Sequence, residues 1–202
     1  MPNETAIANA LSGSGHGATL HVGTRSLQKT DSRTQIYLSG IGKGHGVDRV
    51  AQALAGLGLT DYMVEIGGDL YTSGRNPDGR PWQIGIERPD VALSGVERIA
   101  KVSNLGMATS GDYRNYFEED GVRYSHILDA RTGRPVTHKT ASATVLAAYA
   151  MLADAWATAM LGLGRERGLA VAETENLAVL FVERNGQSFT ATPSTRFTAL
   201  QS

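Results

Sequence analysis

Residues 142–160 read SATVLAAYAMLADAWATAM, which predicts a buried strand over residues 142–147 followed at once by a buried helix over about 149–163. Within this helix Asp154 and Thr158 are four residues apart, so both oxygen-bearing side chains lie on one face. Taking an unpaired carboxylate out of water is costly. Asp154 therefore needs a partner, which is either a bound cation or an intramolecular salt bridge.

The rest of the chain alternates between helical and strand patterns. Helices are expected over residues 4–11 and 45–58, and the second of these ends on glycine. Strands are expected over residues 18–22, 61–68, 69–74, 82–89, 97–102, 105–109, 122–128 and 176–183. The strands between residues 61 and 89 should form a meander, and residues 186–200 a terminal hairpin. This pattern predicts a single α+β domain over residues 1–202, with mostly antiparallel strands and two long helices.

Composition excludes several classes of protein. The chain has 202 residues and 41% hydrophobic content, which is enough for one sizeable core. Its 19 Lys and Arg residues nearly balance 20 Asp and Glu residues, so the net charge of -1 favours neither nucleic acid nor an anionic membrane as a partner. The absence of cysteine excludes disulfides, thiolate metal sites and a cysteine nucleophile. We also expect no signal peptide and no membrane span.

The segment LSGIGKGHGVD, residues 38–48, leads through closely spaced glycines into the helix that follows. The exposed backbone N–H groups, the positive end of the helix dipole and Lys43 would suit a phosphate or pyrophosphate. A plain strand-to-helix turn explains the same residues equally well. For Asp48 we favour the simpler interpretation, a charge that stabilises the start of its own helix.

Three further segments carry polar residues that a core does not need. In EIGGDLYTSG, residues 65–74, the two glycines indicate a turn, although Glu65 and Asp69 could contact a ligand. In MATSGDYRNYF, residues 107–117, Ser110 or Asp112 could cap a helix or close a turn. In YSHILDARTGRPV, residues 124–136, His126 is a candidate general base beside Asp129, although a lone histidine is more often structural.

Taken together, the segments resemble one family in order and spacing, from about residue 20 to the C-terminus. LSGIGKGHGVD, VEIGGDL, W-x-IGI-x-x-P, ATSGDYRNYF, HILDARTGRPV and ADAWATAMLGLG resemble the successive motifs of the ApbE-type FAD:protein FMN transferases. The resemblance implies an ApbE-like (T-fold-like) fold. It also implies a Mg²⁺-dependent enzyme that cleaves FAD, releases AMP and attaches FMN to a threonine of an acceptor protein, typically a subunit of a membrane redox complex.

The resemblance also assigns roles to individual residues. It makes Asp154, Thr158 and the carbonyl of Gly42 the metal ligands, a set of oxygen atoms that suits Mg²⁺. His126 corresponds to the base that deprotonates the acceptor hydroxyl, with Asp129 orienting it. The expected flavin-binding residues are Ser39, Lys43, His45, Thr109, Ser110, Gly111, Asp112, Leu128 and Ala157.

Some features depart from the family pattern. Tyr37, Gly42 and Ala130 stand where members commonly carry Asp, Ala and Pro, and full-length members have a longer N-terminal part with flavin contacts and usually an export signal. The resemblance implies an extracytoplasmic location, while the lack of a signal in this chain leaves a cytoplasmic one open. The alternative functions are an FAD pyrophosphatase, which gives FMN and AMP, and a non-enzymatic FAD-binding module.

Overall fold

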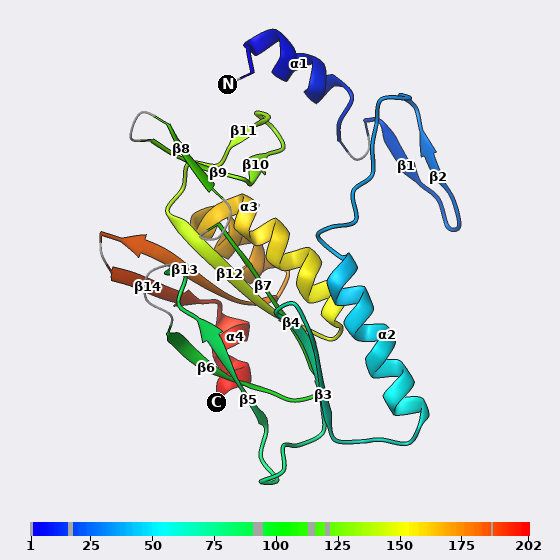
Figure 1. Ribbon diagram of the computed structural model, residues 1–202, viewed down its shortest axis with the longest axis vertical. Coiled ribbons are helices and arrows are strands. Elements are labelled where there is room, and N and C mark those ends of the chain that lie inside the picture. Colours follow the sequence, from blue (N-terminus) through cyan, green and yellow to red (C-terminus); the bar gives the residue numbers. More distant parts are fainter. Residues whose placement is uncertain (1, 16–17, 91–94, 113–115, 120–121, 187) are drawn as a thin grey trace.

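A computed structural model describes residues 2–15, 18–90, 95–112, 116–119, 122–186 and 188–202. Its centre is a six-stranded antiparallel sheet with the strand order β14-β13-β12-β7-β4-β3 (Figure 1). These strands are β3 Tyr62–Ile66, β4 Asp69–Ser73, β7 Leu105–Gly111, β12 Thr140–Ala147, β13 Ala178–Asn185 and β14 Ser188–Pro193. The helices are α1 Glu4–Ser12, α2 Gly42–Gly56, α3 Ala150–Thr174 and α4 Thr195–Gln201.

Four two-stranded ribbons complete the described part of the fold. They pair β1 Leu20–Val22 with β2 Leu27–Lys29, β5 Trp82–Glu87 with β6 Val96–Val102, β8 Tyr116–Glu119 with β9 Val122–Ser125, and β10 Leu128–Asp129 with β11 Arg134–Pro135. The mostly antiparallel α+β fold with two long helices, predicted from the sequence, is confirmed.

The central sheet is buried on both faces, which explains why the residues of β12 are buried without alternation. Val145, Val179 and Phe181 pack with α3 in one apolar cluster, whereas the adjacent residues Leu146 and Leu180 belong to a second cluster. The second cluster includes residues of β5, β6 and α4, so α3 and the β5–β6 ribbon cover opposite faces of the sheet.

Helix α3 consists of two segments. Gly164 has φ 73° and ψ 166°, a conformation that interrupts the helix and is accessible to glycine. The helix then resumes, and the Arg165 amide donates to the Thr140 Oγ1 atom at 2.8 Å. The predicted helix over about 149–163 matches the first segment, but the continuation to Thr174 was not predicted.

Two local predictions are wrong. The β3–β4 hairpin forms as expected, but β5 pairs with β6 in a separate ribbon while β4 pairs with β7, so there is no meander over residues 61–89. Residues 195–201 form α4 instead of the second half of a hairpin. There the Phe197 amide donates to Ser194 Oγ at 3.2 Å, and the Phe197 side chain is fully buried.

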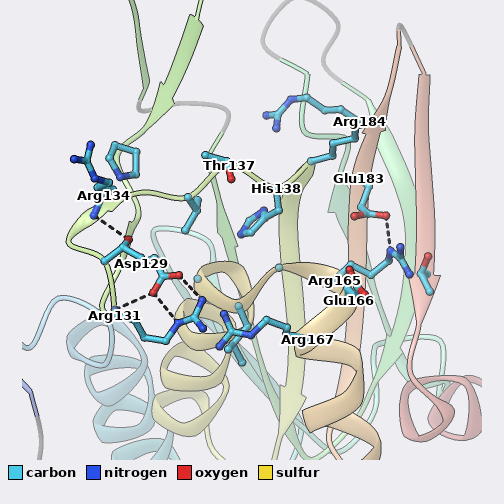
Figure 2. A pocket seen from close by; sticks show the side chains of 18 of the residues that line it. Asp129, Arg131, Arg134, Thr137, His138, Arg165, Glu166, Arg167, Glu183 and Arg184 are labelled. Carbon is cyan, nitrogen blue, oxygen red and sulfur yellow. Dashed lines mark hydrogen bonds and ion pairs between the residues drawn. The ribbon is translucent and has the colours of Figure 1, made fainter. Parts of the chain in front are cut away.

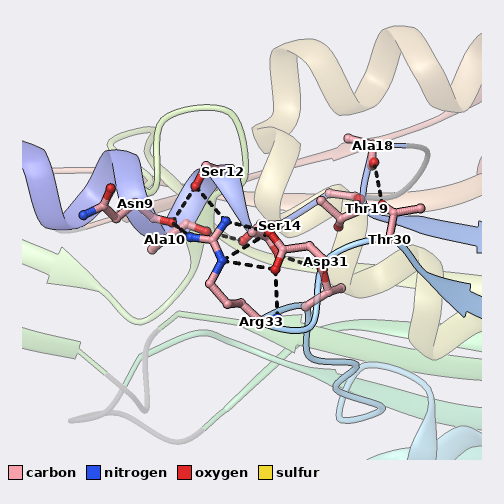
Figure 3. Close-up of polar contacts among 12 residues, drawn as sticks. Asn9, Ala10, Ser12, Ser14, Ala18, Thr19, Thr30, Asp31 and Arg33 are labelled. Atoms are coloured by element: carbon pink, nitrogen blue, oxygen red, sulfur yellow. Dashed lines mark hydrogen bonds and ion pairs between the residues drawn. The ribbon is translucent and has the colours of Figure 1, made fainter.

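The N-terminal segment lies at one end of the molecule and is held by polar contacts (Figure 3). Arg33 pairs with Asp31 at 2.6 Å, and it also donates to the Asn9 carbonyl and the Ser12 hydroxyl at the C-terminal end of α1. Helix α1 in turn touches the β10–β11 ribbon through an ion pair between Glu4 and Arg134. These contacts connect α1 to the segment that leads into α2.

Candidate functional site

The first turns of α2 and α3 approach each other closely because glycine occupies the contact positions. A Cβ atom on Gly44 would lie 2.4 Å from the Ala150 carbonyl oxygen, and a Cβ on Gly106 of β7 would lie 2.4 Å from the Ala150 nitrogen. Both distances are far inside van der Waals contact. Glycine at these two positions therefore allows the N-terminus of α3 to pack against α2 and β7.

Two aspartates connect the helix starts reciprocally. The Gly44 amide of α2 donates to Asp154 Oδ2 at 3.2 Å, and the Ala150 and Met151 amides of α3 donate to the Asp48 carboxylate at 2.8 and 2.9 Å. The interpretation of Asp48 as a charge acting on its own helix is thus wrong. Its carboxylate caps the other helix, a partner 102 residues away that local pattern cannot indicate.

The three predicted metal ligands converge on the glycine-rich segment. Asp154 is 5% exposed and is bonded to Gly44, while a Cβ on Gly40 would lie 3.1 Å from Thr158 Oγ1. Gly42 lies between these two contacts along the chain. The structure therefore brings the backbone around Gly42 to the face of α3 that carries Asp154 and Thr158.

A second buried carboxylate joins this group. Asp69 is 1% exposed, and its Oδ1 accepts from Lys43 Nζ at 3.1 Å, while Oδ2 is buried without a hydrogen-bond partner in the described part of the chain. Burial raises the pKa of Asp69 to about 6, the negative charge of Asp154 adds to this rise, and Lys43 opposes it. Two neighbouring carboxylates, one with an unsatisfied oxygen, form a site that favours a cation.

The donor atoms fit a hard cation such as Mg²⁺. Among the described residues, no group of three or more His, Asp or Glu side chains could hold a metal by itself. A cation here would have to add the Thr158 hydroxyl, a backbone carbonyl, water or ligand phosphate oxygens to the two carboxylates, which is the usual coordination of Mg²⁺.

A cavity of about 400 Å³ adjoins this group of residues. Lys43 and the Gly67–Gly68 turn form one part of its wall, and the strands β3, β4, β5 and β7 form the remainder. The residues lining it are Lys43, Glu65, Gly67, Gly68, Leu70, Ile84, Gly85, Ile86, Glu87, Met107, Thr109 and Gly111. Its apolar floor and charged rim are typical of a small-molecule site.

The predicted flavin-binding residues do not all lie at this cavity. Thr109 and Gly111 line it, and Ser110 Oγ lies 3.4 Å from Thr158 Oγ1. Asp112 instead forms a partly buried ion pair with Arg184 of β13, a partner that the sequence pattern does not indicate. Residues 113–115 of the same motif lie outside the described residues.

The other predicted contacts differ in exposure. Ser39 and His45 are exposed near the start of α2, and Leu128 is exposed on β10. Ala157 lies on the face of α3 that packs against the sheet, and it is fully buried there. For Ala157 the structure therefore supports a packing role and provides no contact surface for a ligand.

His126 lies between β9 and β10 and is exposed. The next residue, Ile127, packs against the α3 cluster, and a Cβ on Gly162 would lie 4.0 Å from it. Since residues 154, 158 and 162 share one helix face, Ile127 packs about one turn beyond Thr158 along this face, and His126 precedes it in the chain.

The orienting role predicted for Asp129 has no support in its contacts. All the side-chain hydrogen bonds of Asp129 within the described residues are with Arg131, at 2.8–3.2 Å. These bonds lower the pKa of Asp129 to about 2. Its carboxylate is therefore engaged by the arginine.

Comparison with known proteins identifies the fold family. A sequence model of the ApbE family matches residues 1–181. The chain belongs to the ApbE family. It is 46% identical over 172 residues to a FAD:protein FMN transferase of Vibrio cholerae and 45% identical over 176 residues to one of Haemophilus influenzae. These alignments cover 85% and 87% of this ApbE-family chain but only 52% and 51% of the relatives, so the chain spans about half their length.

Solved ApbE structures have the same fold. The apo form of the Pseudomonas stutzeri flavinyl transferase ApbE superposes with a TM-score of 0.87 at 39% identity, covering 100% of this chain and 62% of that one. The flavin transferase ApbE from Vibrio cholerae superposes with a TM-score of 0.86 at 40% identity, covering 98% and 63%. Within the described residues, no helix is both long and apolar enough to cross a membrane.

Proposed function

We propose that this ApbE-family chain catalyses the Mg²⁺-dependent transfer of FMN from FAD to a threonine hydroxyl of an acceptor protein, with release of AMP. The observation that carries the proposal is the pair of buried carboxylates, Asp69 and Asp154, beside Lys43 and the open cavity. The names of the relatives, FAD:protein FMN transferase, support the same substrates.

The metal would be held by Asp154, Thr158 and the Gly42 carbonyl, and we add Asp69 as a fourth candidate because one of its oxygens is unsatisfied. When bound there, Mg²⁺ would supply positive charge that neutralises the pyrophosphate oxygens of FAD. Lys43 would bind the same phosphates, because its ammonium group lines the cavity, and the positive end of the α2 dipole would add to this attraction.

His126 is the proposed general base. The threonine oxygen of the acceptor attacks the phosphorus on the FMN side of the pyrophosphate, the phosphoanhydride bond breaks, and AMP leaves. The hydroxyl proton passes to the imidazole of His126, whose neighbour Ile127 packs along the face of α3 that carries Asp154 and Thr158. The products are AMP and a protein that carries FMN through a phosphoester.

Two alternatives use the same site. An FAD pyrophosphatase would need the same metal and base, with water as the attacking group. A non-enzymatic FAD-binding module would need the cavity but not the Asp69–Asp154 pair.

On the basis of family resemblance, the acceptor that we propose is a subunit of a membrane redox complex. The enzyme would modify this subunit on the extracytoplasmic side of the membrane.

The test is to incubate the protein with FAD, Mg²⁺ and a threonine-bearing acceptor peptide, and to weigh the peptide by mass spectrometry. A mass gain equal to FMN less one water supports transfer, while free FMN with an unchanged peptide supports the pyrophosphatase. A matched peptide with valine in place of threonine should gain no mass. Bound but intact FAD in every sample would contradict both enzymatic functions.

A further inference from the structure

A second and larger cavity, of about 880 Å³, lies at the kink of α3, further along this helix than the metal residues at its start. Figure 2 shows this cleft between the ribbon, the start of β12, the kink of α3 and the end of β13. Six Lys or Arg residues line it against three Asp or Glu residues. The cleft is therefore locally positive, although the whole chain has a net charge of -1.

Two of these cations are available to a ligand. The four others are paired: Arg131 with Asp129, Arg134 with Glu4, Arg165 with Glu183 and Arg184 with Asp112. In the described part of the chain, the side chains of Lys139 and Arg167 make no hydrogen bond or ion pair. Both residues are exposed, so their charges can attract carboxylates or other anions from solution.

His138 adds an unsatisfied polar group to the same wall. Both of its ring nitrogens are buried without a hydrogen-bond partner among the described residues, and the ring packs against the kink, where a Cβ on Gly164 would lie 2.5 Å from its Cδ2 atom. Buried polar atoms in native proteins usually have partners, so exceptions often mark functional positions.

The cleft adjoins the segment that carries the proposed base. Val136, which lines the cleft, donates its amide to the carbonyl of Ile127 at 3.0 Å, and Ile127 follows His126 directly. Gly162, one turn beyond Thr158, lines the cleft as well. The segment with His126 thus adjoins both the cleft and the face of α3 that carries Asp154 and Thr158.

We infer that this cleft receives an acidic segment of the acceptor polypeptide, whose carboxylates pair with Lys139 and Arg167 close to the threonine that is modified. The inference rests on the proposed function. If FAD occupies the cavity beside Lys43, the acceptor needs a separate approach to His126, and the cleft adjoins the segment that carries this residue. Clusters of basic side chains recognise acidic peptide motifs in the same way.

The test uses fluorescein-labelled peptides with a central threonine flanked either by aspartates or by asparagines, and fluorescence anisotropy in the presence of Mg²⁺. The wild type should bind the aspartate peptide about tenfold more tightly, and added salt should reduce the difference. The double variant Lys139→Glu/Arg167→Glu should lose this preference. The matched control is Arg98→Glu/Arg196→Glu, which makes the same charge change at exposed positions on β6 and α4 and should keep the preference.

Three results would each overturn the inference. The wild type could bind both peptides equally, the control variant could lose the preference for the aspartate peptide as the cleft variant does, or the cleft variant could keep this preference. If the charge reversal prevents folding, as a thermal melt would show, Lys139→Gln/Arg167→Gln replaces it with the same expectation.

Mass spectrometry of the peptides distinguishes the cleft assignment from the proposed function. Preferential binding of the aspartate peptide without FMN transfer would remove only the proposed function, whereas equal transfer to both peptides without binding preference would remove only the cleft assignment.

Discussion

At the scale of single residues, the site depends on carboxylates that the fold buries at a cost. Asp69 is almost inaccessible, its charge is opposed by burial and by Asp154, and Lys43 compensates only one of its oxygens. Such an arrangement is costly for the metal-free protein and favourable once a cation arrives. The residue-level predictions follow from this balance.

Asp69→Asn should stabilise the metal-free protein at neutral pH. The pKa of Asp69 is raised from 3.8 to about 6, so ionisation of the folded protein costs stability as the pH rises through this window. Asparagine does not ionise. The difference in melting temperature between variant and wild type, measured in EDTA, should therefore increase from about pH 4 to about pH 6 and then level off. A difference that is independent of pH would contradict the assignment.

Asp154→Asn should fold but lose the effect of Mg²⁺. The amide oxygen can still accept from the Gly44 amide, which now donates at 3.2 Å, whereas the charge that would bind the cation is gone. A Mg²⁺ titration of FAD turnover, with circular dichroism to verify folding, measures the result. An identical titration curve for the variant and the wild type would show that Asp154 is not a metal ligand.

His126→Asn should separate binding from chemistry. Loss of a general base typically reduces the rate by about 10²- to 10⁴-fold, while FAD and Mg²⁺ binding should stay close to wild type. Equilibrium dialysis measures binding, and mass spectrometry of the acceptor peptide measures transfer. If the variant loses FAD affinity or retains full transfer, His126 has a different role.

At the scale of elements, the close packing of α3 against α2 and β7 brings the metal residues together. The contact depends on Gly44 and Gly106, and on Asp48, which caps α3 from α2. Because the same turn of α3 leads to Asp154, any increase in the distance between these elements should weaken both the fold and the site.

Gly106→Ala should destabilise the protein by about 1–3 kcal/mol or more, because its Cβ would overlap the backbone of Ala150. Gly56→Ala is the matched control, since a Cβ there meets nothing within 4 Å at the end of α2. Its stability should be unchanged or higher by up to about 1 kcal/mol. Urea unfolding of both variants provides the measurement, and equal stabilities would contradict this account of the interface.

At the scale of the whole molecule, the central sheet and α3 contribute to the walls of two separate cavities. One lies beside the buried carboxylates and Lys43, and the other is the cationic cleft at the kink of α3. This arrangement suits a reaction in which a nucleotide and a polypeptide approach from different directions.

Mg²⁺ and FAD should stabilise the protein together. The two carboxylates alone offer too few ligands, so the cation should bind tightly only when phosphate oxygens complete its coordination. When the free ligand concentration is one hundred times the dissociation constant, binding raises the free energy of unfolding by about 2.7 kcal/mol. Thermal melts with Mg²⁺ and FAD should show this shift, whereas riboflavin, which lacks the pyrophosphate, should not. An equal shift with riboflavin would argue against phosphate binding at this site.

The sequence by itself determined the strand and helix of residues 142–160, the oxygen pair Asp154 and Thr158, and the family. These features are encoded in local periodicity and in motif order, and the structure and comparisons confirm the fold and the family. The sequence also indicated that Asp69, which follows two glycines, could contact a ligand.

Only the tertiary structure decided which partners these residues meet. Asp154 bonds to an amide 110 residues away, Asp48 caps a helix other than its own, and Asp112 pairs with Arg184. The tertiary structure also decided the pairing of β5 with β6, the formation of helix α4 and the cationic cleft. The physical reason is that a local pattern fixes which face of an element is apolar, whereas the partner of a buried charge depends on segments that the folded core brings together.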